Sequence, residues 1–407
     1  MKICIITGYF HPEIAADTHM LLDLSSDLVR YGADVSVVAP FPSKGLDEQT
    51  RQKYSELPQE ISGDGVNIYR VGLKSAEGKN FIIRGIRYIL LSFYIYRKAK
   101  RIKPDVYFVN SQPPFLGLAG AFLSKIAPTV YILQDIFPDS LVYTKNSKET
   151  SIAFKLLKKA EKFIYKKNTH ILAISEDFKK NILAKGVPAE KISVIYNWVD
   201  VNTVIPLRRT ENELIPKYNL DPASFYVTYC GNIGYSQNLE MVVDVAKSLE
   251  TTCSDLKFVF NGDGSWLNEI KEYIKLKNAG NVLIIPYQPY EIISSVYSLG
   301  DVSLVCSKKS VSTGSVPSKT WSIMSAARAV LCSFDVDSEL CTIIKRAECG
   351  ICVPPEDDSE FEKALLKLYN NRQKTEQYGV NGREFIKKNL TREYSTMEYF
   401  KLIKSLI

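Results

Sequence analysis

The chain has 407 residues, of which 45% are hydrophobic and 24% are charged. This length exceeds the size at which one hydrophobic core stops growing, so two domains of roughly 200 residues are expected. The composition is that of a globular protein, and no stretch has the uninterrupted run of about 18 apolar residues that a membrane-spanning helix needs. Residues 1–7 have the pattern of a strand rather than of a signal peptide, which predicts a cytoplasmic protein.

The positive charge is concentrated in the first half of the chain. Residues 1–200 hold 28 Lys and Arg against 20 Asp and Glu, a charge of +8, and residues 201–407 hold 24 against 25, a charge of −1, so the first half carries the whole net charge of +7. Residues 81–103 and 155–167 combine basic with aromatic and aliphatic side chains. Such stretches suit an anionic membrane surface, although a sheet-covering helix with a solvated basic end has the same composition. No sequence motif of a nucleic-acid-binding domain accompanies the basic residues, so nucleic acid is not an expected partner.

Short apolar segments rich in β-branched residues alternate with helix-length segments along the whole chain. This alternation predicts an α/β protein with two doubly wound, Rossmann-like domains whose strand ends face a central cleft. The first domain is predicted at 1–202, with the helical segment 388–407 packing on it, and the second at 203–387. The predicted strands are residues 3–7, 35–38, 66–71, 106–109, 130–133, 171–174, 192–195, 226–229, 258–260, 282–285, 302–305, 330–331 and 351–353.

Three loops follow predicted strands directly and are rich in glycine or polar residues. They are residues 8–19, 231–238 and 261–265. Glycine after a strand lets the backbone approach a ligand closely, but each loop by itself could be a plain turn. Together they are expected to border one ligand site.

A fourth segment, residues 313–330, has the pattern of a loop, a helix and an apolar strand. Gly314 and Pro317 indicate a turn, Ser318 is a candidate N-cap, and Lys319 lies in the first helical turn. Helix N–H groups and a lysine favour a phosphate, although loop-to-helix junctions with a lysine are common.

The eight cysteines lie mostly in apolar segments, where thiols behave as small hydrophobic groups. Cys349 and Cys352 have CxxC spacing, but there is no second pair and no nearby histidine. We therefore predict no metal site.

Taken in order, several motifs resemble those of glycosyltransferase family 4, of the GT-B type. They lie at residues 9–13, 134–140, 196–200, 231–234, 316–319, 337–339 and 349–350. The chain most resembles the branch that contains bacterial O-antigen and capsule L-fucosamine transferases.

This resemblance implies a retaining, metal-independent transferase with no cofactor besides its donor substrate, a UDP-sugar. It implies transfer of an N-acetylated, 6-deoxy amino sugar to a polyprenyl-diphosphate-linked saccharide in the synthesis of O-antigen or capsular polysaccharide. The acceptor would bind the first domain and the nucleoside diphosphate the second. We expect the protein on the inner face of the cell membrane, held by residues 81–103 and 155–167.

The sequence departs from the family pattern at four positions. Two glutamates of the family are matched by Gly314 and Ser322, and an Arg and a Lys are matched by Ile233 and Gln237. The missing charges leave Lys319 to neutralise the diphosphate, helped by Lys308, Lys309 and Arg328. They also leave open a second hypothesis, a non-catalytic partner of another transferase.

The candidate catalytic residues are Asp135, Glu13 and Lys319. Asp135 directly follows a predicted strand on the ligand side of the sheet, although it could simply be a cap before Pro138. Glu13 could instead be a carboxylate that interacts favourably with the N-terminal dipole of the next helix and has no catalytic role. His11 is a weaker candidate. The candidate donor-binding residues are Gly231, Asn232, Gly234, Asn261, Gly262, Gly264, Pro317, Ser318, Lys319 and Glu339.

Overall fold

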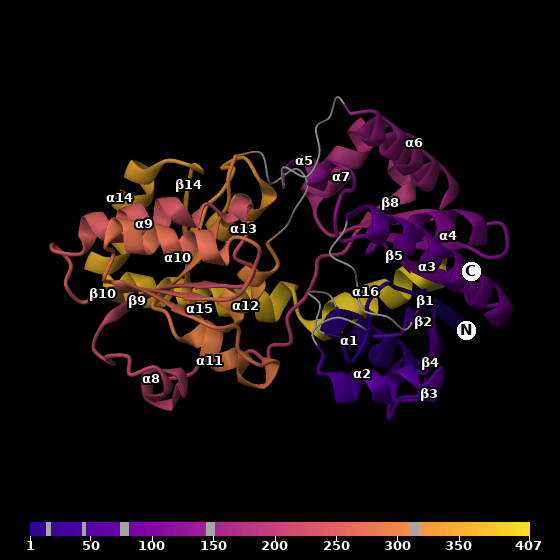
Figure 1. Ribbon diagram of the computed structural model, residues 1–407, viewed down its shortest axis with the longest axis horizontal. Helices are drawn as coiled ribbons and strands as arrows, with labels where there is room; N and C mark the ends of the chain where they lie inside the picture. Colours follow the sequence, from indigo (N-terminus) through magenta and orange to yellow (C-terminus); the bar gives the residue numbers. More distant parts are fainter. Residues whose placement is uncertain (14–17, 43–45, 74–80, 144–150, 310–316) are drawn as a thin grey trace. The chain divides into compact units, whose positions relative to one another are not determined.

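The computed structural model describes residues 1–13, 18–42, 46–73, 81–143, 151–309 and 317–407 (Figure 1). The chain divides into two compact units, one of Met1–Asn197 with Glu393–Ile407 and one of Trp198–Arg392. Each unit is a sheet covered by helices on both faces. Among the described residues, no helix combines the length and the apolar character that crossing a bilayer requires.

The first unit contains an eight-stranded sheet in the order β3-β4-β2-β1-β5-β6-β7-β8. All neighbours pair in parallel except β3 and β4, which are antiparallel. Buried β-branched and aromatic residues fill β5 and β6, as expected for strands covered on both faces. The strands are β1 (Lys2–Ile6), β2 (Asp34–Pro40), β3 (Gln59–Ile61), β4 (Asn67–Val71), β5 (Val106–Asn110), β6 (Thr129–Leu133), β7 (His170–Ala173) and β8 (Ile192–Val194).

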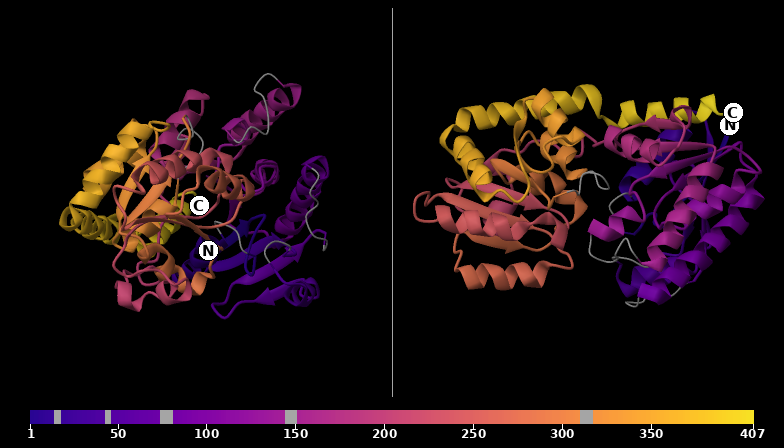
Figure 2. Two further views of the ribbon diagram at one scale, coloured as in Figure 1. Left: turned by 60° about the vertical axis from the view of Figure 1, so that its left-hand side comes forward. Right: turned by 90° about the horizontal axis from the view of Figure 1, so that it is seen from above.

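The helices of the first unit connect these strands. Leu21, Leu24 and Leu28 form the buried face of α1, as their helical spacing predicts. Phe122 contacts both Tyr96 and Phe163, so α4 lies between α3 and α6 (Figure 2). The helices are α1 (Thr18–Arg30), α2 (Glu48–Ser55), α3 (Phe81–Ile102), α4 (Leu116–Leu123), α5 (Asp139–Tyr143), α6 (Ile152–Lys167), α7 (Glu176–Ala184) and, from the end of the chain, α16 (Arg392–Ser405).

Helix α16 packs on the first unit although it follows the second in sequence. Its Thr396 donates a hydrogen bond to Asp27 of α1 at 3.0 Å, and its buried Tyr399 contacts Phe108 of β5. The predicted helical segment 388–407 is not one helix, because α15 ends at Asn389 and α16 begins at Arg392.

The second unit contains a six-stranded, wholly parallel sheet in the order β11-β10-β9-β12-β13-β14. Its core includes Phe258, Val242 and Phe361, from the sheet and the helices on one face. The strands are β9 (Phe225–Cys230), β10 (Leu256–Asn261), β11 (Val282–Ile285), β12 (Val302–Cys306), β13 (Ala329–Ser333) and β14 (Gly350–Val353). The helices are α8 (Leu214–Lys217), α9 (Leu239–Leu249), α10 (Leu267–Lys277), α11 (Ile293–Ser298), α12 (Lys319–Ser325), α13 (Glu339–Arg346), α14 (Asp358–Asn370) and α15 (Arg372–Asn389).

The predicted fold class, two doubly wound parallel sheets, is confirmed. In both sheets the strand order changes direction beside the first strand, between β1 and β5 and between β9 and β12. Ligands of such sheets bind outside the carboxyl ends of the strands at this switch point. The fold thus directs the search for a site to the loops after β1, β5, β9 and β12.

Candidate functional site

Lys319, the first residue of α12, places its ammonium at the carboxyl edge of the second unit's sheet. Its Nζ is buried, and no hydrogen-bond partner for it exists among the described residues. The ammonium lies 3.6 Å from the centre of the Tyr229 ring, at the end of β9. A Cβ on Gly231 would stand 3.7 Å from it. Lys319 thus extends from the segment after β12 to the segment after β9, which is the switch point of this sheet.

Burial lowers the pKa of Lys319 to about 8, because an ammonium loses hydration in this position. Cys230 and Cys306 are its titratable neighbours, and burial raises the pKa of each thiol to about 12. Both thiols are therefore neutral at pH 7 and do not pair with the ammonium. A buried charge without a partner is costly, so an anionic ligand at this point would relieve a penalty that the folded chain carries.

The two glycine loops beside Lys319 are packed against each other by their backbones. Gly231 N–H donates to Asn261 O at 2.9 Å, and Ile233 N–H donates to Asp263 O at 2.8 Å. A Cβ on Gly262 would lie 1.9 Å from Gly231 O, and one on Gly264 would lie 2.2 Å from Ile233 O. The glycines that we assigned to ligand approach are thus required first for the contact between the two loops.

The polar residues of these loops have defined partners. The Tyr229 hydroxyl donates to Asn232 O at 2.5 Å, and the side chain of Asn232 is exposed. Asn261 is buried and donates to Pro286 O at 3.1 Å. Gly234 N–H donates to the Gln237 side chain at 2.9 Å. Of this set, Asn232 is the side chain that the loop presents to solvent.

Two of the departures from the family pattern have a structural basis. Ile233 is fully buried in the hydrophobic core of the second unit, so a charged side chain would not fit there. Gln237 fixes the loop through Gly234. Of the other two positions, Ser322 lies in α12, and Gly314 lies outside the described residues, as do the neighbouring residues 313 and 315–316.

An aromatic surface at this edge was missed by the sequence reasoning. Tyr235 and Trp266 meet edge to face with ring centres 5.2 Å apart, and Lys308 Nζ lies 3.4 Å from the centre of the Tyr235 ring. The only sequence signal was an aromatic residue directly after each glycine loop. Lys309 is exposed, and Glu339 is half-buried as the first residue of α13.

Ser318 is the N-cap residue of α12, as predicted, but its side chain makes no capping bond. Pro317 O instead accepts from Thr320 N–H and hydroxyl. One prediction about this segment is wrong. Arg328 cannot assist Lys319, because α12 ends at Ser325 and Arg328 precedes β13 at the amino edge of the sheet. There its Nη2 donates to Leu207 O at 2.6 Å.

The carboxyl edge of the first sheet is held by side-chain pairs. Gln112 Nε2, after β5, donates to Asp135 Oδ2 at 2.7 Å, after β6. Glu13 is buried, and its carboxylate accepts from Phe10 N–H at 3.4 Å. His11 is exposed, and its carbonyl accepts from Arg70 Nη2 at 2.9 Å. The structure therefore places Asp135 on the predicted side of its sheet, and Glu13 and His11 in the loop after β1.

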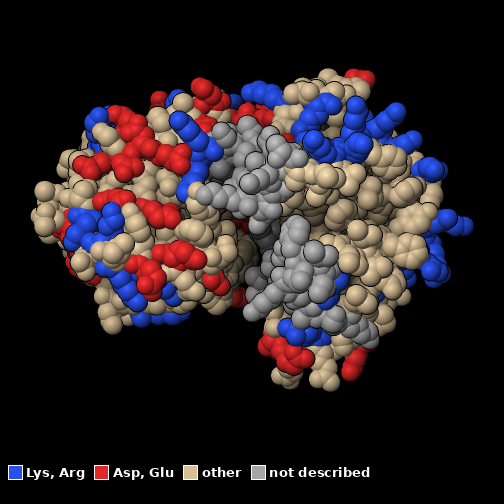
Figure 3. All heavy atoms as spheres, turned by 45° about the horizontal axis from the view of Figure 1, so that its top comes forward, with Lys and Arg blue, Asp and Glu red and all other residues tan. Residues whose placement is uncertain are grey.

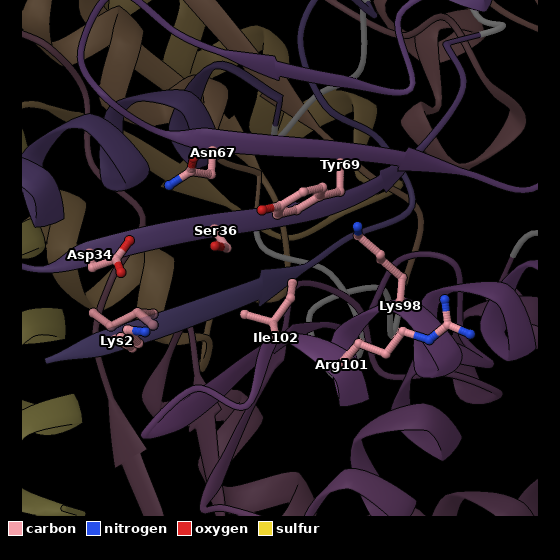
Figure 4. A pocket seen from close by; sticks show the side chains of 9 residues that line it. Lys2, Asp34, Ser36, Asn67, Tyr69, Lys98, Arg101 and Ile102 are labelled. Atoms are coloured by element: carbon pink, nitrogen blue, oxygen red, sulfur yellow. The ribbon is translucent and has the colours of Figure 1, made fainter.

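A pocket of about 310 Å³ lies at the opposite, amino edge of the first sheet (Figure 4). Lys2 and Asp34 line it from the first positions of β1 and β2, and Lys98 and Arg101 line it from α3. Lys98 Nζ stands 3.8 Å from the centre of the Tyr69 ring. None of the candidate site residues lines this pocket, and Lys98 is held in it rather than on the open surface.

The CxxC pair does not come together. Cys349 Sγ donates to Ile344 O at 3.6 Å, whereas Cys352 groups with Cys332 and Cys341. The sulfur atoms of these last three lie within 4.8 Å of one another. Sequence spacing could not show this cluster, because β13, α13 and β14 contribute one cysteine each.

Comparison with known proteins gives the same two-part division. Residues 18–203 match the model of Glycosyltransferase Family 4, and residues 210–385 match that of Glycosyl transferases group 1. WbjE of Pseudomonas aeruginosa, named as a probable glycosyltransferase, is 24% identical over 67% of this chain and 66% of its own length. WcaI of Escherichia coli strain K12, whose name assigns it to colanic acid biosynthesis, is 21% identical over 99% of this chain and 100% of its own length.

The fold comparison agrees with this division. The HepE structure from Anabaena, solved in complex with UDP, matches 100% of both chains with a TM-score of 0.74 at 15% identity. Such a match shows the fold, and the two family models account for most of the sequence. The chain is thus a glycosyltransferase that consists of a family 4 domain followed by a group 1 domain.

Proposed function

We propose that the protein is a retaining glycosyltransferase that moves an N-acetylated, 6-deoxy amino sugar from a UDP-sugar to a lipid-linked saccharide during O-antigen or capsular polysaccharide synthesis. In the reaction, the bond between the sugar C1 and the diphosphate breaks, and a bond from C1 to an acceptor oxygen forms on the same face. The acceptor hydroxyl's proton passes to the leaving phosphate. The residues must therefore stabilise a diphosphate whose negative charge grows as the bond breaks.

The single observation that supports this function is the buried Lys319 ammonium beside Gly231. A charge fixed in a site with little water stabilises a developing anion strongly, because it needs no reorganisation during the reaction. Its position at the switch point of the second sheet fits a nucleoside diphosphate, as the resemblance implies for this domain. Lys308 over Tyr235 supplies a second cation on the same edge.

The donor is proposed to be a UDP-sugar. Structures of HepE have been solved in complex with UDP and in complex with UDP-glucose. The amino-sugar class comes from the resemblance of the sequence motifs. A panel of UDP-, GDP- and dTDP-sugars, with detection of the released nucleotide and of the transferred sugar, tests it. Turnover only with a GDP-sugar would contradict the choice of donor.

The non-catalytic alternative rests on the departures at Gly314 and Ser322. The same panel separates the two functions. Absence of turnover with every donor, together with tight association with another transferase, would favour the non-catalytic partner. Turnover by the isolated chain that is lost in Lys319→Met would exclude it.

The acceptor is proposed to be presented from an anionic membrane surface, which the first unit would bind through α3, α4 and α6. Helix α3 exposes a stripe of large apolar side chains at helical spacing, and α4 and α6 continue it. The exposed residues are Ile86, Ile89, Leu90, Phe93, Tyr94, Phe122, Leu156 and Phe163. An apolar stripe of this kind on a helix that is not buried is typical of interfacial binding.

Basic residues border this apolar surface. Arg97, Lys100 and Arg101 are exposed at the end of α3, and α6 adds Lys155 and Lys159. Lys158 of α6, in contrast, pairs with Asp139 at 2.6 Å and Glu161 at 2.7 Å. The part of Figure 3 that corresponds to the first unit shows Lys and Arg beside uncharged side chains, whereas the second unit shows both signs.

Vesicle binding tests the membrane proposal. The triple variant Arg97→Gln, Lys100→Gln, Arg101→Gln should lose roughly 3 kcal/mol of binding to anionic vesicles, since each basic residue contributes about 1 kcal/mol. Lys98 is left in place because it is half-buried and its Nζ lies over the Tyr69 ring, whereas Arg101, which also lines the amino-edge pocket, is exposed. The control variant Lys271→Gln, Lys275→Gln, Lys388→Gln removes the same charge from exposed positions of the second unit and should keep binding. Equal loss in both variants would show a general charge effect and contradict the α3 surface.

A further inference from the structure

Cys332, Cys341 and Cys352 form a compact group of thiols in the second unit. Cys332 lies near the end of β13, and Cys352 is its direct register partner on β14. Cys341 lies in the first half of α13, the helix that follows β13. Their three sulfur atoms lie within 4.8 Å of one another. Three elements that are distant in sequence thus bring one soft ligand atom each to the same point.

The spacing is close to that of a metal-thiolate site. Bonds from zinc to sulfur are about 2.3 Å long, so sulfur atoms around one tetrahedral ion are roughly 3.8 Å apart. The largest separation, 4.8 Å, requires the sulfur atoms to approach by about 1 Å. Rotation about the Cα–Cβ bonds can supply part of this movement, and the helix that carries Cys341 can supply the rest.

Burial and charge at the group also suit a bound cation. Cys332 and Cys341 are fully buried, whereas Cys352 is only half-buried and provides a route from solvent. Three thiolates around a divalent ion leave a net charge of about −1. Lys345, one turn after Cys341 on α13, is close enough to stabilise the thiolates of Cys341 and Cys352. The Cys341 amide is already fixed by the Ser338 hydroxyl at 3.3 Å, so the start of α13 is ordered around the group.

We propose that Cys332, Cys341 and Cys352 bind one thiophilic divalent cation of the zinc class through their three sulfur atoms. The fourth position of the ion is left to water, as in zinc sites with three protein ligands. Binding requires all three sulfur atoms as thiolates, and the protons that the thiols lose are released to solvent. Because α13 begins at Glu339, a bound ion would also fix the helix that carries this candidate donor-binding residue. The proposal does not depend on the glycosyltransferase reaction.

The test uses the whole chain, with thiols kept reduced by a phosphine, titrated with Cd²⁺ and separately with Zn²⁺. We expect one ion per chain, ultraviolet thiolate-to-cadmium charge-transfer absorption and proton release in a weakly buffered solution. Cys341→Ser and Cys352→Ser should each weaken metal binding at least about 10-fold. Even the loss of a residue that only hydrogen-bonds to a metal ligand typically lowers metal affinity by about 10–100-fold. Cys349→Ser is the matched control, because Cys349 is outside the group, and its affinity should equal that of the wild type.

Cys352→Ser is the decisive variant, because a half-buried position tolerates a hydroxyl better than the core positions do. Its thermal unfolding is measured beside the titration, so that a folding defect is recognised. Binding that survives in folded Cys352→Ser and Cys341→Ser, or that falls equally in Cys349→Ser, would overturn the proposal. So would wild-type protein that binds no Cd²⁺ with charge-transfer absorption. Donor turnover, measured separately, reports on the proposed function alone.

Discussion

The carboxyl edges of the two sheets share a strand order but are held in different ways. In the first unit, side chains pair with side chains, as Gln112 does with Asp135 and Asn197 with Gln134. In the second unit, backbone bonds such as Gly231 to Asn261 join the loops through glycine. Lys319 there remains buried without a hydrogen-bond partner in the part of the chain that the structure describes.

This difference teaches what each edge can offer a ligand. Loops joined by their backbones are fixed without using side-chain charges, so the Lys319 ammonium beside them remains available to an anion. Loops joined by carboxylate and amide side chains present groups that can exchange partners with the hydroxyls of a saccharide. The comparison thus favours the diphosphate on the second unit and the acceptor on the first.

The largest expected effect is that of Lys319→Met, which removes the charge and keeps the length of the side chain. Turnover should fall by about 10²–10³-fold, since removing one donor aimed at developing charge costs about 2.7–4 kcal/mol. Stability should not fall, because the buried unpaired ammonium is a cost in the folded state. Steady-state kinetics and thermal unfolding measure both. A near-normal rate would move the phosphate site elsewhere.

A smaller effect is expected for Gly262→Ala, which tests the backbone contact between the loops. The new Cβ would meet Gly231 O, so the loops must separate, at a cost of about 1–3 kcal/mol in the free energy of unfolding. UDP affinity should fall with it. Gly63→Ala, in the first unit, is the control, since nothing lies within 4 Å of its Cβ position. Denaturant unfolding measures the free energy of unfolding of both variants. Equal values for Gly262→Ala and Gly63→Ala would show that the two loops do not need this backbone contact.

The smallest expected effect is that of Asp135→Asn on the first unit. The amide oxygen can still accept the bond from Gln112, so the fold should persist. The hydrogen bonds that hydroxyls of the saccharide acceptor donate to the charged carboxylate would weaken by about 1.5 kcal/mol, roughly 10-fold in kcat/KM. UDP affinity should stay unchanged. If UDP affinity falls and acceptor kinetics do not, the division of roles between the two edges is wrong.

The sequence predicted the framework better than the site. Every predicted strand is present, because buried β-branched segments such as residues 106–109 have few alternatives to a covered parallel strand. The short β3 was missed, since Gln59–Ile61 carries no apolar pattern, and the end of α12 at Ser325 was not predicted. The residue at which a helix ends depends on tertiary contacts, and the hydrophobic periodicity of the sequence does not show those contacts.

The sequence was enough to propose individual site residues, but it could not show which of them are buried and which already have hydrogen-bond partners. Lys319 was found from its place beside a helix start, yet its isolation depends on Tyr229 and Gly231, about ninety residues earlier in the chain. The thiol group of Cys332, Cys341 and Cys352 joins three elements, so the CxxC spacing of Cys349 and Cys352 could not reveal it. The roles of the glycines in loop packing likewise appear only when both loops are seen together.

The most direct test of the central claim is the number of protons taken up when UDP binds at pH 8.5. Lys319 has a pKa of about 8 in the free protein, so it is mostly neutral at this pH, and a nearby diphosphate favours its charged form. Affinity should therefore fall as the pH rises through 8. Calorimetry in buffers of different ionisation enthalpy should show an uptake of roughly three-quarters of a proton by the wild type, and none by Lys319→Met. Equal uptake by both proteins, or no uptake by the wild type, would contradict the account.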